Sequence, residues 1–243
     1  MKKLDINLLK IYDHRYQPFS IRNPEPIMKR PNNTEKKIIQ AALEIFVRKG
    51  YHGTSVDEIT RKVGLTKGAL YSHFSGKGEL LLRIIDEFKS RFIGGMIEAL
   101  DQCSGNAMDR IYRVFSFNSR FALENQDLCV FLTFLTTELN ADVDFEPALK
   151  GTYAEYRKVI GEIISLGIRQ GLFKKDLDPE ISALTFMALH DGVLHQWVLN
   201  RNHVDAELYV RTFREIFLHG LVKHGTPRDD SRTRRAGTRS STV

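Results

Sequence analysis

Two very short helices separated by a single glycine constrain the fold of this chain more than any other feature. The stretch Asp57–Phe74 reads DEITRKVGLTKGALYSHF, with Gly64 at the break. Ser55 and Glu58 have the spacing of a capping box, which predicts that the first helix begins after Ser55. Thr66 is a good N-cap for the second helix. Helices of about seven or eight residues are marginal alone in water, so both must pack on a larger partner.

A longer amphipathic helix precedes this pair and supplies the partner. Thr34 is its expected N-cap and Gly50 its end. Its apolar residues recur at i, i+3, i+4 and i+7, which makes one stripe. They are Ile39, Ala42, Leu43 and Phe46. Helices over 35–50, 56–63 and 67–74 have the proportions of a helix-turn-helix with a supporting first helix.

The outward face of the third helix has the chemistry of a DNA-reading element. Lys67 can bond guanine or a phosphate, and the small Gly68 and Ala69 let the helix end approach a groove closely. Lys77 begins the next helix, where free backbone N–H groups favour an anion. A solvated surface is the alternative for these side chains. The residues expected to contact DNA are Thr54, Ser55, Thr66, Lys67, Gly68, Ala69, Tyr71, Ser72, His73 and Lys77.

The stretch Thr34–Leu81 resembles the DNA-binding domain of the TetR family of bacterial transcriptional regulators. The resemblance covers 48 residues, and the 33 residues ahead of it depart from the family pattern. It implies that Thr66 to His73 form the recognition helix and that Lys77 contacts the DNA backbone. The matching positions are Ala42, Phe46, Gly50, Tyr51, Thr54, Ile59, Gly64, Gly68, Leu70, Tyr71, Phe74, Lys77 and Leu80.

Charge divides the chain into a basic front and an acidic body. Residues 1–33 and 34–83 each carry a net charge of +4, residues 225–243 carry +3, and residues 84–224 carry −5. This asymmetry suggests that one part meets an anion while another does something else. We therefore expect an N-terminal extension (1–33), a DNA-binding domain (34–80), a ligand-binding and dimerisation domain (81–224) and a basic, disordered tail (225–243).

The remaining pattern predicts an all-α fold of about nine helices in total. Beyond the first three, helices are expected over 77–100, 107–124, 128–139, 145–171, 179–200 and 205–223. No apolar run approaches the roughly 18 residues that span a bilayer, and the N-terminus lacks the apolar centre of a signal peptide. Two cysteines without a C-x-x-C motif suggest buried thiols in a reducing cytoplasm.

The last two predicted helices are apolar on every side, so each must be covered on every side. One side would pack on the core and the other on a second chain, which gives a homodimer with a two-fold axis. The family resemblance implies the same arrangement, with two recognition helices about 34 Å apart on palindromic double-stranded DNA. The expected interface residues are Leu189, Val193, Gln196, Trp197, Phe213 and Phe217.

The middle helices are rich in phenylalanine, which is core by default. The resemblance, however, implies a small-molecule pocket in this region, apolar with a few polar groups. We expect a hydrophobic or aromatic effector, neutral or cationic because the body is acidic. The candidate pocket residues are Met96, Phe115, Asn118, Phe121, Phe131, Phe134, Tyr153, Tyr156, Met187 and His190.

Other functions find less support in the sequence. His190 and His195 lie about 140° apart on a helix, which makes a poor metal-binding pair, and Asp191 with His195 is better explained as an internal bond. No motif for a cofactor, a catalytic triad or a phosphate loop is present. We therefore expect a ligand-responsive DNA-binding regulator, most readily a repressor released by its effector. The alternative is a non-specific nucleic-acid or membrane-surface binder acting through its basic tails.

Overall fold

The structure is a computed structural model that describes residues 32–135, 144–200 and 203–222. Most of the predicted N-terminal extension, the basic tail and the predicted helical residues 136–139 lie outside this range. The predictions made for those segments are therefore not addressed by the structure.

The described residues fold as helices without a named strand. They are α1 (Asn33–Lys49), α2 (Val56–Val63), α3 (Lys67–Tyr71), α4 (Lys77–Lys89), the π-helical turn η2 (Ser90–Gly94), α5 (Gly95–Asp101), α6 (Ala107–Glu124), α7 (Gln126–Leu135), α8 (Glu146–Arg169), α9 (Pro179–Asn200) and α10 (Ala206–Leu221). Because α4, η2 and α5 follow one another without a break, they form one rod. Counting that rod once, the described part of the chain contains nine helices, as the sequence predicted.

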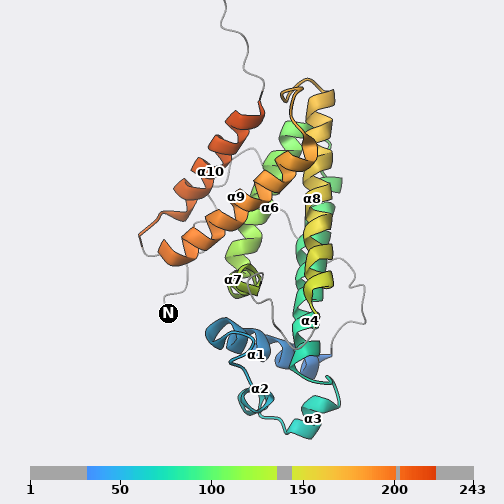
Figure 1. The fold of residues 1–243 in the computed structure, drawn as a ribbon, viewed down its shortest axis with the longest axis vertical. Helices are drawn as coiled ribbons and strands as arrows, with labels where there is room; N and C mark the ends of the chain where they lie inside the picture. The colour runs from blue at the N-terminus through green and yellow to red at the C-terminus, as the bar shows by residue number, and fades with distance from the viewer. Residues whose placement is uncertain (1–31, 136–143, 201–202, 223–243) are drawn as a thin grey trace, which may run out of the picture.

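Figure 1 shows α1, α2 and α3 gathered at one end of the molecule. The rod that begins with α4 runs from this end into the body, and α8 lies along it. α9 packs on α8 and α7, and α10 packs on α9. The three-helix end is therefore joined directly to the body by the rod.

The three-helix end is held by the buried face of α1. Ile38, Ala42 and Phe46 are each at most 1% exposed, and Ile59 of α2 and Leu70 of α3 are fully buried. Thr34 is not the N-cap of α1. Asn32 caps it instead, because its side chain accepts from the backbone N–H groups of Thr34 and Glu35.

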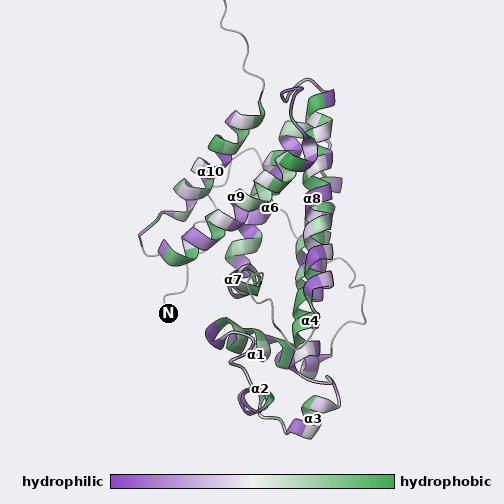
Figure 2. Cartoon of the chain, in the orientation of Figure 1, coloured by the Kyte–Doolittle hydropathy of each residue, from purple (hydrophilic) through white to green (hydrophobic). Residues whose placement is uncertain are grey.

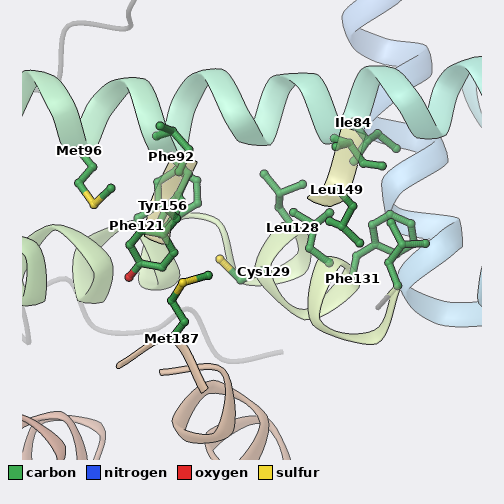
Figure 3. Packing of buried hydrophobic residues seen from close by; sticks show 14 of the residues in the cluster. Ile84, Phe92, Met96, Phe121, Leu128, Cys129, Phe131, Leu149, Tyr156 and Met187 are labelled. Atoms are coloured by element: carbon green, nitrogen blue, oxygen red, sulfur yellow. The ribbon is translucent and has the colours of Figure 1, made fainter. Parts of the chain in front are cut away.

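The body is built around an aromatic core beside the rod. Figure 3 shows Phe92, Phe121 and Tyr156 gathered next to it, with Met187 of α9 on the opposite side. Figure 2 shows green, apolar segments where the helices of the body meet. Within the described ranges, no helix is both long enough and apolar enough to cross a membrane.

Candidate DNA-binding surface and effector cavity

The turn between α2 and α3 sets the position of the reading helix. The capping box is present: the Glu58 N–H donates to Ser55 Oγ at 3.3 Å, and the Ser55 N–H donates to Glu58 Oε2 at 3.1 Å. Gly64 ends α2 with φ of 71°, a left-handed conformation that favours glycine. Leu65 follows, and its N–H closes the turn on the Thr60 carbonyl at 2.9 Å.

Helix α3 is shorter than the predicted 67–74 because it ends at Tyr71. Thr66 caps it as expected, accepting from the Ala69 N–H at 3.2 Å. The hydroxyl of Ser72 donates to the Ala69 carbonyl at 2.8 Å and so occupies the end of the helix. Past this point the chain turns so that Phe74 enters the core, where it is 3% exposed.

The outer face of α3 is open. Tyr71 is 52% exposed, and Gly68 and Ser72 are also exposed. A Cβ atom on Gly68 would have Thr66 Oγ1 at 3.9 Å as its nearest contact, so packing inside the protein does not require glycine here. The small size of Gly68 therefore leaves room outside the protein rather than within it.

Two polar residues of the expected DNA surface are paired within the protein. Lys67 Nζ lies 2.7 Å from Asp57 Oδ1 of α2, with both side chains more than half exposed. His73 Nδ1 lies 3.4 Å from Glu35 Oε1 of α1. DNA phosphates would compete with these carboxylates for the same side chains.

Lys77 and Thr54 are placed differently from the other expected contacts. The Lys77 ammonium donates to the carbonyls of Tyr51 and Thr54, at 3.2 and 3.4 Å, and lies 4.4 Å from the centre of the Tyr51 ring. Since an ammonium has three donors, one remains for a phosphate. Thr54 is 3% exposed and its hydroxyl donates to the Gly50 carbonyl at 2.8 Å, so its side chain is buried and bonded within the protein.

Two structural links join the DNA-binding end to the body. One is the rod, and the other is the stacking of Phe46 in α1 on Phe131 in α7, with ring centres 5.5 Å apart and planes 17° apart. Phe131 was expected to line the ligand pocket. It instead lies in the contact between α1 and α7.

The π-helical turn lies in the rod at the level of the aromatic core. Its residue Phe92 contacts Phe88, Phe121 and Tyr156, with ring centres 5.0 to 5.1 Å apart. The preceding Arg91 bonds Asn125, the residue that ends α6. Single π turns in helices are often found at functional sites. The sequence did not predict this turn.

A first cavity lies between α6, α9 and α10. Its volume is about 850 Å³, including space open to solvent, and its wall is mainly apolar. The residues that line it are Phe115, Asn118, Ser119, Ala122, Leu123, His190, Val193, Leu194, Trp197, Ala206, Glu207, Tyr209, Val210 and Phe213.

A second cavity lies between the rod, α6, α7, α8 and α9, and its volume of about 520 Å³ also includes space open to solvent. Asn118 Nδ2 donates to the Tyr156 hydroxyl here at 2.5 Å. Burial raises the pKa of Cys129 to about 12, so this thiol stays protonated. The lining residues are Phe88, Phe92, Ile93, Asn118, Phe121, Ala122, Cys129, Leu132, Thr133, Thr152, Tyr153, Tyr156, His190, Asp191 and Leu194.

The structure brings six of the ten expected pocket residues to these cavities. They are Phe115, Asn118, Phe121, Tyr153, Tyr156 and His190. Met96 and Met187 are buried but line neither cavity, as is true of Phe131. The side chain of Phe134 lies outside the described part of the chain.

No group of three or more metal-binding side chains comes together within residues 32–135, 144–200 and 203–222. His190 Nδ1 lies 3.6 Å from Asp191 Oδ1, so the histidine approaches the neighbouring carboxylate. The predicted bond between Asp191 and His195 stays a prediction.

The expected dimer interface is only partly on the surface. Leu189 is 41% exposed and Gln196 is exposed, whereas Val193 and Trp197 line the first cavity. The prediction that Phe213 and Phe217 lie in the dimer interface is wrong, because both are buried inside the protomer. Each packs against Phe115 and Phe186. The exposed apolar side chains on α9 and α10 are Ile181, Leu184, Leu189, Leu199, Leu208 and Ile216.

An exposed reading helix on a three-helix unit, joined to a helical body with cavities, defines a helix-turn-helix DNA-binding regulator that senses a small molecule. Two family models match the chain. Residues 38–84 match "Bacterial regulatory proteins, tetR family", and residues 108–222 match "BetI-type transcriptional repressor, C-terminal". The chain belongs to the TetR family of bacterial transcriptional regulators.

Relatives and solved structures agree with this assignment. The chain is 24% identical over 196 residues to the fatty acid metabolism regulator protein of Bacillus subtilis (strain 168), covering 80% of this chain and 98% of that one. It is 48% identical over 52 residues to the transcriptional regulator SrpR of Pseudomonas putida, covering 21% of this chain and 24% of that one.

Two crystal structures are similar in fold. The MbdR regulator from Azoarcus sp. CIB has a TM-score of 0.69 at 24% identity, over 77% of this chain and 98% of that one. FadR from Bacillus subtilis in complex with stearoyl-CoA has a TM-score of 0.68 at 22% identity, over 76% and 98% of the two chains.

Proposed function

We propose that the protein is a repressor that binds a palindromic operator as a homodimer and is released from it by a small hydrophobic effector. The observation that carries this proposal is the open outer face of α3, where Lys67, Gly68 and Tyr71 are exposed. The repressor role is favoured by the description of the matching C-terminal family model. Its site of action would be the cytoplasm, where the operator DNA is, and its role regulatory rather than catalytic.

Dimerisation through α9 and α10 is favoured by the apolar side chains exposed on both helices. Ile181, Leu184 and Leu199 of α9 are 40 to 63% exposed, and Leu208 and Ile216 of α10 are 51 and 66% exposed. Large apolar side chains exposed on two neighbouring helices favour an interaction site there. A two-fold axis there would set two copies of α3 about one DNA turn apart.

Release follows if the effector binds best to a conformation in which the two reading helices no longer match the groove spacing. Such a shift requires different effector affinities for the two conformations. The rod supplies a path for it, because Phe92 touches the second cavity while the N-terminus of the same rod follows α3.

Footprinting of the DNA that flanks the gene, in about 0.15 M salt, tests DNA binding. We expect a protected palindrome, bound much more weakly after the double substitution Lys67→Ala/Tyr71→Ala. Inserting about half a helical turn of DNA between the half-sites should abolish binding by the dimer. Protection no stronger than for random DNA would contradict the proposal.

Two further experiments separate the remaining elements. Leu184→Glu should convert the dimer to a monomer in analytical ultracentrifugation and lower operator affinity, whereas Glu180→Gln, on the same helix, should not. Removing residues 1–27 and 226–243 should leave sequence-specific binding intact. Its loss would favour the alternative, in which the basic tails bind nucleic acid or membrane without specificity. Mass spectrometry of small molecules retained by the purified protein would identify the effector.

A further inference from the structure

The two cavities share one wall. Asn118 and Ala122 of α6 and His190 and Leu194 of α9 line both cavities. On each helix the two residues are four apart and therefore face the same way. The two cavities are therefore neighbours, with these four side chains between them.

This shared wall holds a polar atom that the protein leaves without a partner. Asn118 is 4% exposed, and its Nδ2 donates to the Tyr156 hydroxyl, but its Oδ1 is buried without a hydrogen bond to any described residue. His190 Nδ1 makes no hydrogen bond among the described residues either, but it has the Asp191 carboxylate 3.6 Å away. Buried polar atoms are nearly always satisfied, so Asn118 Oδ1 points to a bound molecule.

Neighbouring side chains fix the His190 ring and the Tyr156 hydroxyl. The His190 ring lies parallel to Phe186, at an interplanar angle of 12°, and edge-on to Tyr156, at 79°. The Tyr156 hydroxyl already accepts from Asn118 and retains its own proton for an acceptor. Burial raises the pKa of Tyr156, so that proton remains on the oxygen. The shared wall therefore offers an acceptor at Asn118, and the second cavity offers a donor at Tyr156.

The charges of the lining exclude some ligands. Among the described residues that line the two cavities there is no lysine or arginine, while Asp191 and Glu207 each contribute a carboxylate. A carboxylate or phosphate on a ligand would have no cation to meet inside these walls. Relatives of this fold include one in complex with stearoyl-CoA, whose phosphates this lining does not match.

We propose that the two cavities are the two arms of one bent site, which binds an uncharged molecule with two apolar arms joined by a central hydrogen-bonding group such as a secondary amide. The N–H of that group donates to Asn118 Oδ1, the buried acceptor that no described residue satisfies. The inference rests on the proposed function, because it names the chemical class of the effector.

Three probes with equal numbers of heavy atoms test this proposal: N-hexylhexanamide, hexyl hexanoate and dodecanoate. Trp197 lines the first cavity and is the only tryptophan of the chain, so its fluorescence reports binding. We expect one amide per protomer, bound about tenfold more tightly than the ester, which lacks the N–H, with the anion weaker still. Equal binding of amide and ester, or preference for the anion, would overturn the proposal.

Two comparisons test the contacts and the two-arm arrangement. Asn118→Leu should remove the preference for amide over ester, whereas Ser119→Ala should keep it, since the Ser119 hydroxyl already donates to the Phe115 carbonyl. If Asn118→Leu does not fold, the comparison of the amide with the ester on the wild-type protein still tests the proposal. N-hexylacetamide, which lacks one arm, should bind at least tenfold more weakly than N-hexylhexanamide. Equal affinity for both, or two N-hexylhexanamide molecules per protomer, would mean two separate pockets.

All these measurements are made without DNA, so they separate this inference from the proposed function. Binding as expected, with no effect of the amide on operator affinity, would sustain the site and contradict its role as the effector site. If the protein binds its operator but shows no preference for the amide, the proposed function stands and this inference about the site is wrong.

Discussion

The Lys67 ammonium on the reading helix lies 2.7 Å from the Asp57 carboxylate on the supporting helix. This pair places a negative charge beside the cation expected to meet DNA. With both side chains more than half exposed, it contributes little to stability, but it must be exchanged for a phosphate or base contact on binding.

Asp57→Asn is therefore expected to raise operator affinity by roughly threefold while changing stability little. The affinity should also depend more steeply on salt, because the freed Lys67 releases an additional counterion on binding. Fluorescence anisotropy with a labelled operator at several salt concentrations measures both effects. Glu44→Gln is the matched control, since it frees Lys62 of α2, which lies 2.6 Å from Glu44 of α1. An equal gain in the control would mean that net charge alone explains the result.

Gly68→Ala should separate DNA contact from folding. The new Cβ would meet only Thr66 Oγ1, at 3.9 Å, and alanine is favoured over glycine in helices by up to about 1 kcal/mol. We expect unchanged or higher thermal stability and at least about tenfold weaker operator binding, as for the loss of one base contact. Gly151→Ala in α8, with no atom near its Cβ position, is the control. Undiminished DNA binding by Gly68→Ala would mean that this end of α3 does not enter the groove.

The sequence predicted the helices well because their ends depend on local chemistry. α2 and α9 have the predicted bounds, and Ser55, Thr66 and Gly64 act as expected. The π turn at 90–94 was not predictable in this way. It depends on where Phe92 meets aromatic side chains from distant helices, which no local pattern records.

The cavities were harder to predict than the DNA-binding surface for a related reason. A phenylalanine in a core helix has the same spacing whether it fills the core, as Phe131 does, or lines a space, as Phe115 does. Likewise, Phe213 and Phe217 lie on a helix with apolar residues on several sides, and only the position of α10 on α9 shows which side faces inward. Sequence reasoning also missed Phe88, Phe92 and Trp197 as cavity residues, because it does not show how the helices that carry them are placed.

Gly167→Ala should destabilise the body. A Cβ atom there would lie 2.1 Å from Cδ2 of Phe173, whose own side chain is 1% exposed. Overpacking of this kind costs about 1–3 kcal/mol, which urea unfolding measures at fixed protein concentration. Gly161→Ala lies in the same helix with its nearest contact, the Pro179 carbonyl, at an ordinary 3.6 Å. Similar unfolding midpoints for the two variants would contradict the expected steric clash.

Cys129 should be unreactive in the folded protein. Burial raises its pKa to about 12, so almost no thiolate is present at pH 8. In a Cys103→Ala background, a disulfide reagent should label Cys129 no faster than the protein opens. The unfolded chain ionises this thiol near pH 8.5, so its contribution to stability is fully present below that pH. It is lost as the pH rises towards 12, with a slope of up to about 1.4 kcal/mol per pH unit. Rapid labelling at pH 8 under native conditions would contradict this, because it would show that the Cys129 thiol is reached by the reagent without opening of the protein.

The stacked rings of Phe46 and Phe131 join the DNA-binding end to the body, so they should be energetically coupled. The ring centres are 5.5 Å apart and both side chains are at most 4% exposed. A double-mutant cycle with Phe46→Leu and Phe131→Leu should give a coupling free energy of about 0.5–1.5 kcal/mol in urea unfolding. Phe46→Leu with Phe217→Leu is the control, because Phe217 instead packs with Phe186, 5.0 Å away, in the body. That pair should be additive to within about 0.5 kcal/mol. If the first cycle were equally additive, the α1–α7 contact would contribute no coupling of its own, and the rod would be the remaining link between effector and DNA.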